Sequence, residues 1–137
     1  METVIANPVK VNKVRKSLYW TFGLLPIITG LDKYLNFLTD WEKYIKAFEG
    51  IIPVSLKTFM MIVGAIEIIA GIVVFIIPRI GAFIVALWLA CIVIVLVAGM
   101  NYYDVAARDL VMAVSAFCLG ELYSYKLKGN KEKAVLK

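Results

Sequence analysis

The chain consists of four long apolar runs separated by short polar segments. The runs cover residues 17–38, 57–78, 80–101 and 105–125. A helix needs about 20 residues to cross the ~30 Å hydrocarbon core of a bilayer, and each run is about that long. The pattern predicts an all-α protein, a transmembrane four-helix bundle with up-down topology. A basic N-terminal stretch (residues 1–16) precedes this membrane domain (17–125), and a lysine-rich tail (126–137) follows it.

The second run contains a single acidic residue, Glu67, near its midpoint. An isolated carboxylate at that depth costs several kcal/mol, so it must be protonated, partnered or turned towards a polar interior. At helical spacing Glu67 shares one face with Met60, Gly64, Gly71 and Val74. Because glycines let a neighbouring helix approach closely, we expect this face to be the inner seam of the bundle.

Small residues recur at helical spacing in other runs. Gly30 lies near the end of the first run, and Ala113 and Gly120 share a face of the fourth. Close contact between membrane helices usually occurs at such positions. We therefore expect helix packing through these three residues and through Gly64 and Gly71.

The polar segment between the first and second runs has the pattern of a short interfacial helix. It opens with the capping pattern Thr39-x-x-Glu42 and closes on Gly50. Its apolar side chains fall on one face and most of its charged side chains on the other. We expect this helix to lie on the outer surface, where two readings stay open: it covers the mouth of a site, or it is only a connector resting on lipid.

Four charged residues lie in the outer half of the expected bundle. Asp32 and Lys33 close the first run, and Arg108 and Asp109 open the fourth. Each would be costly alone in lipid but tolerable in a pair. We therefore expect them to pair between helices, Asp32 with Arg108 and Lys33 with Asp109.

Glu67 lies about two helical turns deeper than this cluster. Its expected partners are therefore the hydroxyls of Thr29 and Ser115, or the backbone carbonyl that Pro26 leaves free. Without a nearby cation, Glu67 should be mostly neutral at pH 7 and donate a hydrogen bond. It is then either an interhelical link only, or a group with a proton-coupled or quinone-facing role.

Composition and charge support a membrane protein. Hydrophobic residues make up 62% of the chain, against about 45–50% in soluble proteins. The net charge of +5 does not indicate nucleic-acid binding, because ten of the fifteen basic residues lie in the N-terminal stretch, the turn at Arg79 and the tail. These regions lie on one side of the bundle, which predicts a multi-pass protein integral to the cell (inner) membrane with both termini cytoplasmic.

The sequence excludes several kinds of chemistry. Histidine is absent, which rules out histidine-ligated haem, histidine zinc sites and histidine proton relays within the chain. We find no metal, haem or nucleotide motif, so we do not expect catalysis by this chain alone. Cys91 and Cys118 lack CxxC spacing, which favours buried free thiols, although spacing alone leaves a disulfide open.

Three motifs resemble those of the DoxX-like family of four-helix integral membrane proteins. They are a GLDK motif from Gly30 to Lys33, a G-x-x-E-x-x-x-G stripe around Glu67, and a turn that reads Pro78-Arg79-x-Gly81-Ala82. The resemblance covers residues 17–125 and implies a four-span bundle. Some members are linked to membrane oxidoreductases, including the small subunit of a thiosulfate:quinone oxidoreductase. No catalytic residue of the family can be assigned to this chain.

Three functions remain open at this point. The resemblance favours an accessory or anchoring subunit of a quinone-linked membrane oxidoreductase, with a quinone bound near Glu67 and the Asp32/Arg108 cluster and with other oxidoreductase subunits as partners. The alternatives are a small proton-coupled transporter that acts as a homodimer, and a structural membrane module without a substrate. The transporter hypothesis requires a dimer because so small a bundle is expected to enclose little volume.

Overall fold

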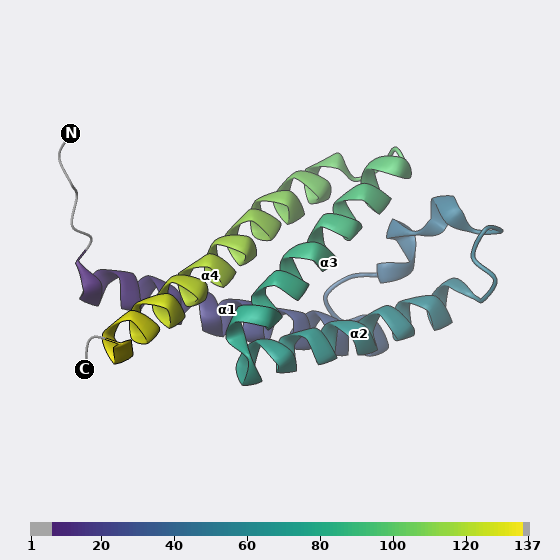
Figure 1. The fold of residues 1–137 in the computed structure, drawn as a ribbon. Helices are drawn as coiled ribbons and strands as arrows, with labels where there is room; N and C mark the ends of the chain where they lie inside the picture. The colour runs from purple at the N-terminus through teal and green to yellow at the C-terminus, as the bar shows by residue number, and fades with distance from the viewer. Residues whose placement is uncertain (1–6, 136–137) are drawn as a thin grey trace.

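The computed structural model describes the backbone of residues 7–135 and the side-chain surroundings of residues 7–125. This part of the chain forms four α-helices and no strands (Figure 1): α1 (Pro8–Leu35), α2 (Leu56–Ile76), α3 (Pro78–Ala98) and α4 (Tyr103–Val135). Two short 3-10 helices, η1 (Trp41–Tyr44) and η2 (Lys46–Phe48), connect α1 to α2. The prediction of an all-α fold is confirmed.

Helix boundaries differ from the edges of the apolar runs at both ends of the chain. Helix α1 begins at Pro8, where the Asn7 side chain accepts a hydrogen bond from the backbone N–H of Val9. It ends at Leu35, because Asn36 takes a left-handed conformation with φ of 50°. The basic N-terminal stretch therefore belongs partly to α1, and α4 likewise continues into the lysine-rich tail. Capping chemistry determines these ends, whereas hydropathy marks only the apolar part of each helix.

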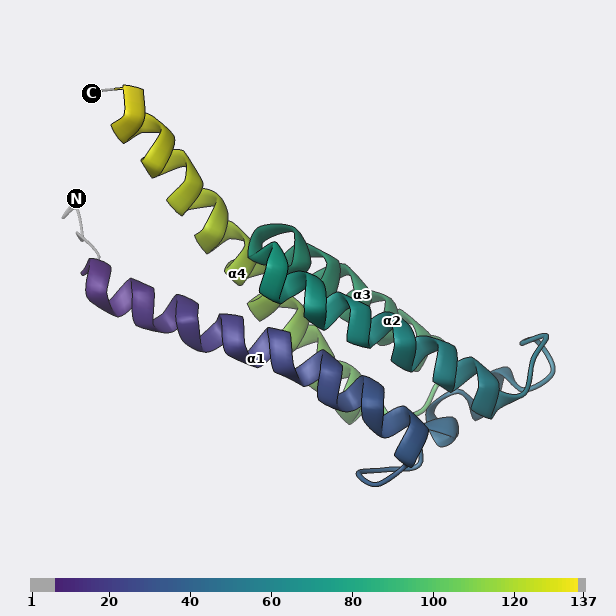
Figure 2. The ribbon, with the colours of Figure 1, turned by 90° about the horizontal axis from the view of Figure 1, so that it is seen from below.

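The four helices form two closely packed antiparallel pairs, α1 with α2 and α3 with α4. The pairs meet where α2 turns into α3 at Ile77 and diverge towards the opposite end of the molecule (Figure 1). We call that opposite end, where η1 and η2 lie, the covered end. The start of α1 and the end of α4 lie at the same end of the molecule, away from the covered end (Figure 2).

Glycines bring α1 and α2 into backbone contact at two levels. A Cβ atom at Gly30 would lie 2.6 Å from the carbonyl oxygen of Gly64, and one at Gly64 would lie 2.6 Å from that of Gly30. At the second level, a Cβ atom at Gly71 of α2 would lie 2.7 Å from the carbonyl oxygen of Gly23 of α1. These glycines form a seam between α1 and α2, and the face of α2 that carries Gly64, Glu67 and Gly71 is buried.

The α3–α4 pair packs through alanines and one glycine. Ala113 and Ala116 of α4 are buried, as are Ala82 and Ala86 of α3. A Cβ atom at Gly120 would meet the ring of Phe83 at 2.8 Å. The apolar core of the molecule extends from this pair to α2, where Val74 is fully buried together with Leu119 of α4.

The predicted interfacial helix is wrong in its form. The segment forms two 3-10 helices with a break at Ile45, and Asp40 rather than Thr39 provides the cap by accepting from the backbone N–H of Glu42. A helix this short has little stability of its own. Contacts with the rest of the protein therefore determine its conformation. Here Ile45 is buried and the Trp41 side chain is hydrogen-bonded to α1.

Helices α2 and α3 are both long and apolar enough to cross a membrane. Large apolar side chains are also exposed on the outer faces of all four helices, for example Ile28, Ile69, Leu87 and Phe117. The two cysteines are free, as favoured above, but both are exposed, so the expected burial is wrong.

The glycine seam generates a stability prediction. Gly64→Ala would force its methyl group against the backbone of α1, which cannot move aside as a side chain can. We expect the substitution to lower the free energy of unfolding by about 1–3 kcal/mol, the usual cost of overpacking. Equilibrium unfolding in mixed detergent micelles measures the change. Gly99→Ala is the matched control, because its new methyl group would have its nearest neighbour at 3.5 Å; equal stability of the two variants would contradict the seam.

Candidate functional site

A cavity of about 790 Å³ lies between the two helix pairs. All four helices line it, and residues of η1 and of the loop before it line it at the covered end. Its walls are mainly apolar, with Leu25, Val63 and Ile92 as examples, and its volume is within the range of about 300–1,000 Å³ typical of ligand sites. Polar side chains line it from every helix and from the segment between α1 and α2. Those of the helices include Thr29, Lys33, Glu67, Trp88, Arg108 and Asp109, and those of the segment are Thr39, Trp41 and Tyr44.

A buried ion pair joins α1 to α2 at this cavity. The Lys33 Nζ atom lies 2.7 Å from Glu67 Oε2, and the two side chains are only 4% and 6% exposed. Side chains on a helix lean towards its N-terminus. Because α1 and α2 are antiparallel, Lys33 leans towards the middle of the bundle and Glu67 leans towards the covered end, so the two meet despite their different depths.

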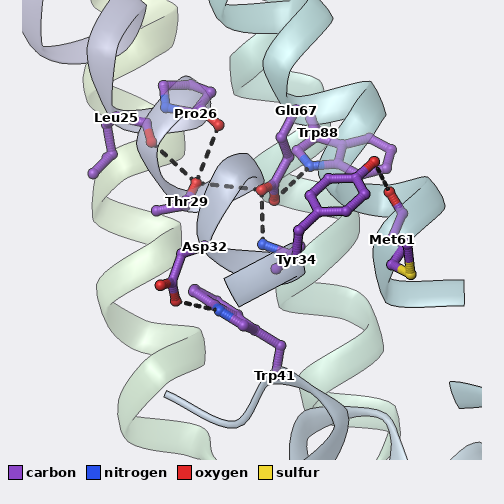
Figure 3. Close-up of polar contacts among 10 residues, drawn as sticks. Leu25, Pro26, Thr29, Asp32, Tyr34, Trp41, Met61, Glu67 and Trp88 are labelled. Atoms are coloured by element: carbon purple, nitrogen blue, oxygen red, sulfur yellow. Dashed lines mark hydrogen bonds and ion pairs between the residues drawn. The ribbon is translucent and has the colours of Figure 1, made fainter. Parts of the chain in front are cut away.

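Glu67 accepts hydrogen bonds from two further donors. The hydroxyl of Thr29 lies 3.2 Å from Oε2, and the indole Nε1 of Trp88 lies 3.3 Å from Oε1 (Figure 3). Lysine and tryptophan side chains can only donate, so Glu67 acts as an acceptor. The expectation of a neutral Glu67 that donates is therefore wrong, because its premise was that no cation lies nearby.

The other expected partners of Glu67 are only partly observed. Thr29 is confirmed, and its hydroxyl also lies 3.4 Å from the carbonyl oxygen of Pro26. Ser115 instead donates to the carbonyl oxygen of Val111 within α4. Trp88 was not among the partners expected from the sequence. Its one signal was an indole N–H, which needs an acceptor, inside an otherwise uncharged apolar run.

Asp32 and Trp41 hold the segment between α1 and α2 (residues 36–55), here called the covering segment, on the end of α1. Asp32 accepts from the backbone N–H groups of Phe37 and Leu38, each at 3.0 Å. It also accepts from Trp41 Nε1 at 2.7 Å (Figure 3). The Lys33 ammonium lies 3.8 Å from the centre of the Trp41 ring, a close cation–π contact. The segment thus covers the cavity, which decides between the two readings left open by the sequence.

The predicted pairing of Asp32 with Arg108 and of Lys33 with Asp109 is wrong. Asp32 is bonded to the covering segment and Lys33 to Glu67. Arg108 and Asp109 line the cavity from α4, which has few contacts with α1 because the cavity lies between them. Residue depth along each helix is visible in the sequence, but the wall from which each side chain approaches is not.

The chain matches no protein-family model, no curated protein and no solved structure.

The buried ion pair makes a prediction about stability. Lys33→Met leaves the Glu67 carboxylate without its cation, so we expect a loss of about 3–5 kcal/mol in the free energy of unfolding. The double variant Lys33→Met/Glu67→Leu removes both charges, and we expect it to recover most of that loss. Equilibrium unfolding of the two variants and of Glu67→Leu completes a double-mutant cycle. Losses that simply add would show that the pair is not coupled.

Proposed function

We propose that this chain is a four-span integral protein of the inner membrane that binds a quinone in its central cavity and serves as an accessory subunit of a quinone-linked oxidoreductase. The main support is the cavity itself, in which apolar walls surround a buried polar cluster. A quinone has the matching character, an apolar tail and a ring with polar oxygens.

The outer surface supports the membrane assignment. Exposed large apolar side chains occur on α1 and α4 as well as on the more apolar α2 and α3. Soluble monomers rarely expose continuous apolar surface of this extent. Lys13 and Arg79 lie at the end of the bundle where the chain enters and leaves, which by the positive-inside rule is the cytoplasmic end.

The position of the cavity supports a ligand that arrives through the lipid. Cys91 lines the cavity and is also exposed on α3, so the cavity reaches the outer surface of the bundle there. Asp32 and Trp41 hold the covering segment over the other end. A membrane-soluble molecule could therefore enter from the side while the covering segment remains in place.

The resemblance to DoxX-like proteins supports the role of oxidoreductase subunit. Three of the four residues of the GLDK motif have positions that fit such a site: Gly30 packs against α2, Asp32 holds the covering segment and Lys33 binds Glu67. The proposal gives this chain the quinone-binding role and assigns electron transfer to partner subunits.

The transporter alternative has less support than the sequence suggested. It required a homodimer because one bundle was expected to enclose little volume, yet a single chain forms a cavity of about 790 Å³. Its proton-carrying residue, Glu67, is held by Lys33, Thr29 and Trp88. A structural module without a substrate leaves the cavity and its polar cluster unexplained.

The proposed topology predicts which positions an impermeant thiol reagent can reach. Lys46 is exposed in η2 at the covered end, and Lys13 is exposed near the start of α1. In intact spheroplasts we expect Lys46→Cys to be labelled by a charged maleimide and Lys13→Cys to be labelled only after the membrane is opened. Both substitutions are made in a chain from which Cys91 and Cys118 have been removed, and this chain without the new cysteine is the control. Labelling of both positions in sealed spheroplasts would refute the orientation.

The quinone site predicts what co-purifies with the protein. Native mass spectrometry after gentle extraction should detect bound quinone in the wild type. Val63 lines the cavity, so Val63→Trp should fill part of it. We expect the substitution to cost about 1.4 kcal/mol of the binding free energy of the quinone, which lowers the affinity about tenfold. Ile62→Trp is the control, because Ile62 is exposed on the outer face of α2. A wild type that retains no quinone and runs as a bare homodimer would favour transport instead.

A further inference from the structure

Three hydrogen-bond donors line the cavity at its covered end. Thr39 and Tyr44 belong to the covering segment, and Arg108 lies near the start of α4, which begins at that end (Figure 1). Among the residues whose side chains the structure describes, none forms a hydrogen bond or an ion pair with these three side chains. The hydroxyls of Thr39 and Tyr44 are accessible rather than buried, and Arg108 is exposed. All three donors are therefore available to a molecule in the cavity.

The donors deeper in the cavity already have an acceptor. Thr29, Lys33 and Trp88 all donate to Glu67. A hydroxyl and an indole each carry a single hydrogen, so Thr29 and Trp88 have none left for a ligand while they are bonded to Glu67. The Lys33 ammonium is held between Glu67 and the ring of Trp41. The donors at the covered end are thus better placed to bind a ligand than those around Glu67.

The opposite end of the cavity, towards the α2–α3 turn, is apolar. Phe22, Ala70 and Val85 line the cavity there and belong to the buried core. A ligand with its oxygen atoms at this end would leave them without hydrogen bonds, which is costly. The lining therefore orients an amphiphilic ligand with its oxygen atoms towards the covering segment.

The charges that line the cavity favour a neutral ligand. Two cations, Lys33 and Arg108, line it together with two acids, Glu67 and Asp109. With their ordinary charges these four side chains sum to zero, so the lining has no net positive charge with which to attract an anion such as a lipid phosphate. Arginine remains charged in proteins and only donates hydrogen bonds. Arg108 thus suits a neutral acceptor such as a carbonyl oxygen.

The ring of Tyr44 is held in place by two aromatic neighbours. Its centroid lies 4.8 Å from that of Tyr102, just before α4, and 6.0 Å from that of Trp41. A side chain that is fixed before binding loses little conformational freedom when a ligand binds. The Tyr44 hydroxyl is therefore a preorganised donor at the covered end.

We propose that the quinone binds with its ring beneath the covering segment, where Arg108 donates a hydrogen bond to a carbonyl oxygen of the ring and the Tyr44 hydroxyl is a second donor. The inference rests on the proposed quinone site and adds the orientation of the ligand and the residues that bind its ring. A hydrogen bond from a guanidinium is charge-assisted and among the stronger ones in proteins. The bound ligand then joins α4 to the covering segment across the cavity.

The first test compares two ligands on the full-length protein in lipid nanodiscs. Isothermal titration calorimetry, with empty nanodiscs as the reference for partitioning, measures the affinity for a short-chain alkyl benzoquinone and for the alkylbenzene with the same chain. The alkylbenzene has the ring but no oxygen to accept a hydrogen bond. We expect the quinone to bind about tenfold more tightly.

Substitutions assign this difference to named donors. Arg108→Met removes the donors at similar side-chain length, and we expect it to lower the quinone affinity about tenfold. Arg79→Met is the matched control, because Arg79 is exposed at the α2–α3 turn. Tyr44→Phe keeps the ring and removes only the hydroxyl, so we expect a loss of about threefold. Tyr103→Phe, at an exposed tyrosine, should leave the affinity unchanged.

Infrared spectroscopy detects the hydrogen bond itself. A donor weakens the C=O bond, so the carbonyl band of the bound quinone should lie at lower frequency than that of quinone in empty nanodiscs. In Arg108→Met we expect the band to move back towards the frequency in lipid, whereas Arg79→Met should keep the shift. A residue that only supported the fold would not move this band.

Each outcome decides between defined possibilities. A wild type that binds the quinone and the alkylbenzene equally, or an unshifted carbonyl band, overturns the proposed orientation but leaves a quinone in the cavity; neither result depends on a folded variant. A folded Arg108→Met that keeps both the affinity and the shifted band overturns the role of Arg108. If the wild type does not bind the quinone, the proposed function fails and the orientation fails with it.

Discussion

The structure depends on one requirement, that the carboxylate of Glu67 be neutralised inside an apolar bundle. A lone charge at that position would cost several kcal/mol. Lys33 meets the requirement from α1 at 2.7 Å, and Thr29 and Trp88 complete the shell from α1 and α3. Three helices are thus tied to one carboxylate. The bond geometry also fixes how far α3 stands from α1 and α2, and so contributes to the shape of the cavity.

Close packing within each helix pair and looser packing between the pairs create that cavity. Backbone contact at Gly30 and Gly64 leaves no space between α1 and α2, and alanines such as Ala113 do the same for α3 and α4. The pairs share a core near the α2–α3 turn, where Val74 is fully buried. Beyond that core the pairs diverge, and the space is covered by a segment that Asp32 holds through Trp41.

The adjacent residues Asp32 and Lys33 divide two tasks between them. Asp32 turns to the covering segment, and Lys33 turns inwards to Glu67 while its ammonium also contacts the Trp41 ring. The cover and the polar cluster therefore share Trp41 as a common element. The Trp41 side chain thus connects the covering segment with the polar cluster around Glu67.

The sequence by itself determined the helices and their buried faces, because the cost of exposing polar groups to an apolar environment acts on every residue according to its type and spacing. The burial of Met60, Gly64, Glu67, Gly71 and Val74 on one face of α2 follows from that rule alone.

Only the tertiary structure decided which groups meet. Lys33 reaches Glu67 because antiparallel helices tilt their side chains towards each other, and Trp88 reaches it from a helix that carries no charge near that point. The ends of α1 and the 3-10 form of the covering segment were likewise decided by caps and by contacts such as the burial of Ile45. Pairing depends on direction around each helix axis and on the separation of the helices, and neither quantity is written in the spacing of residues along one chain.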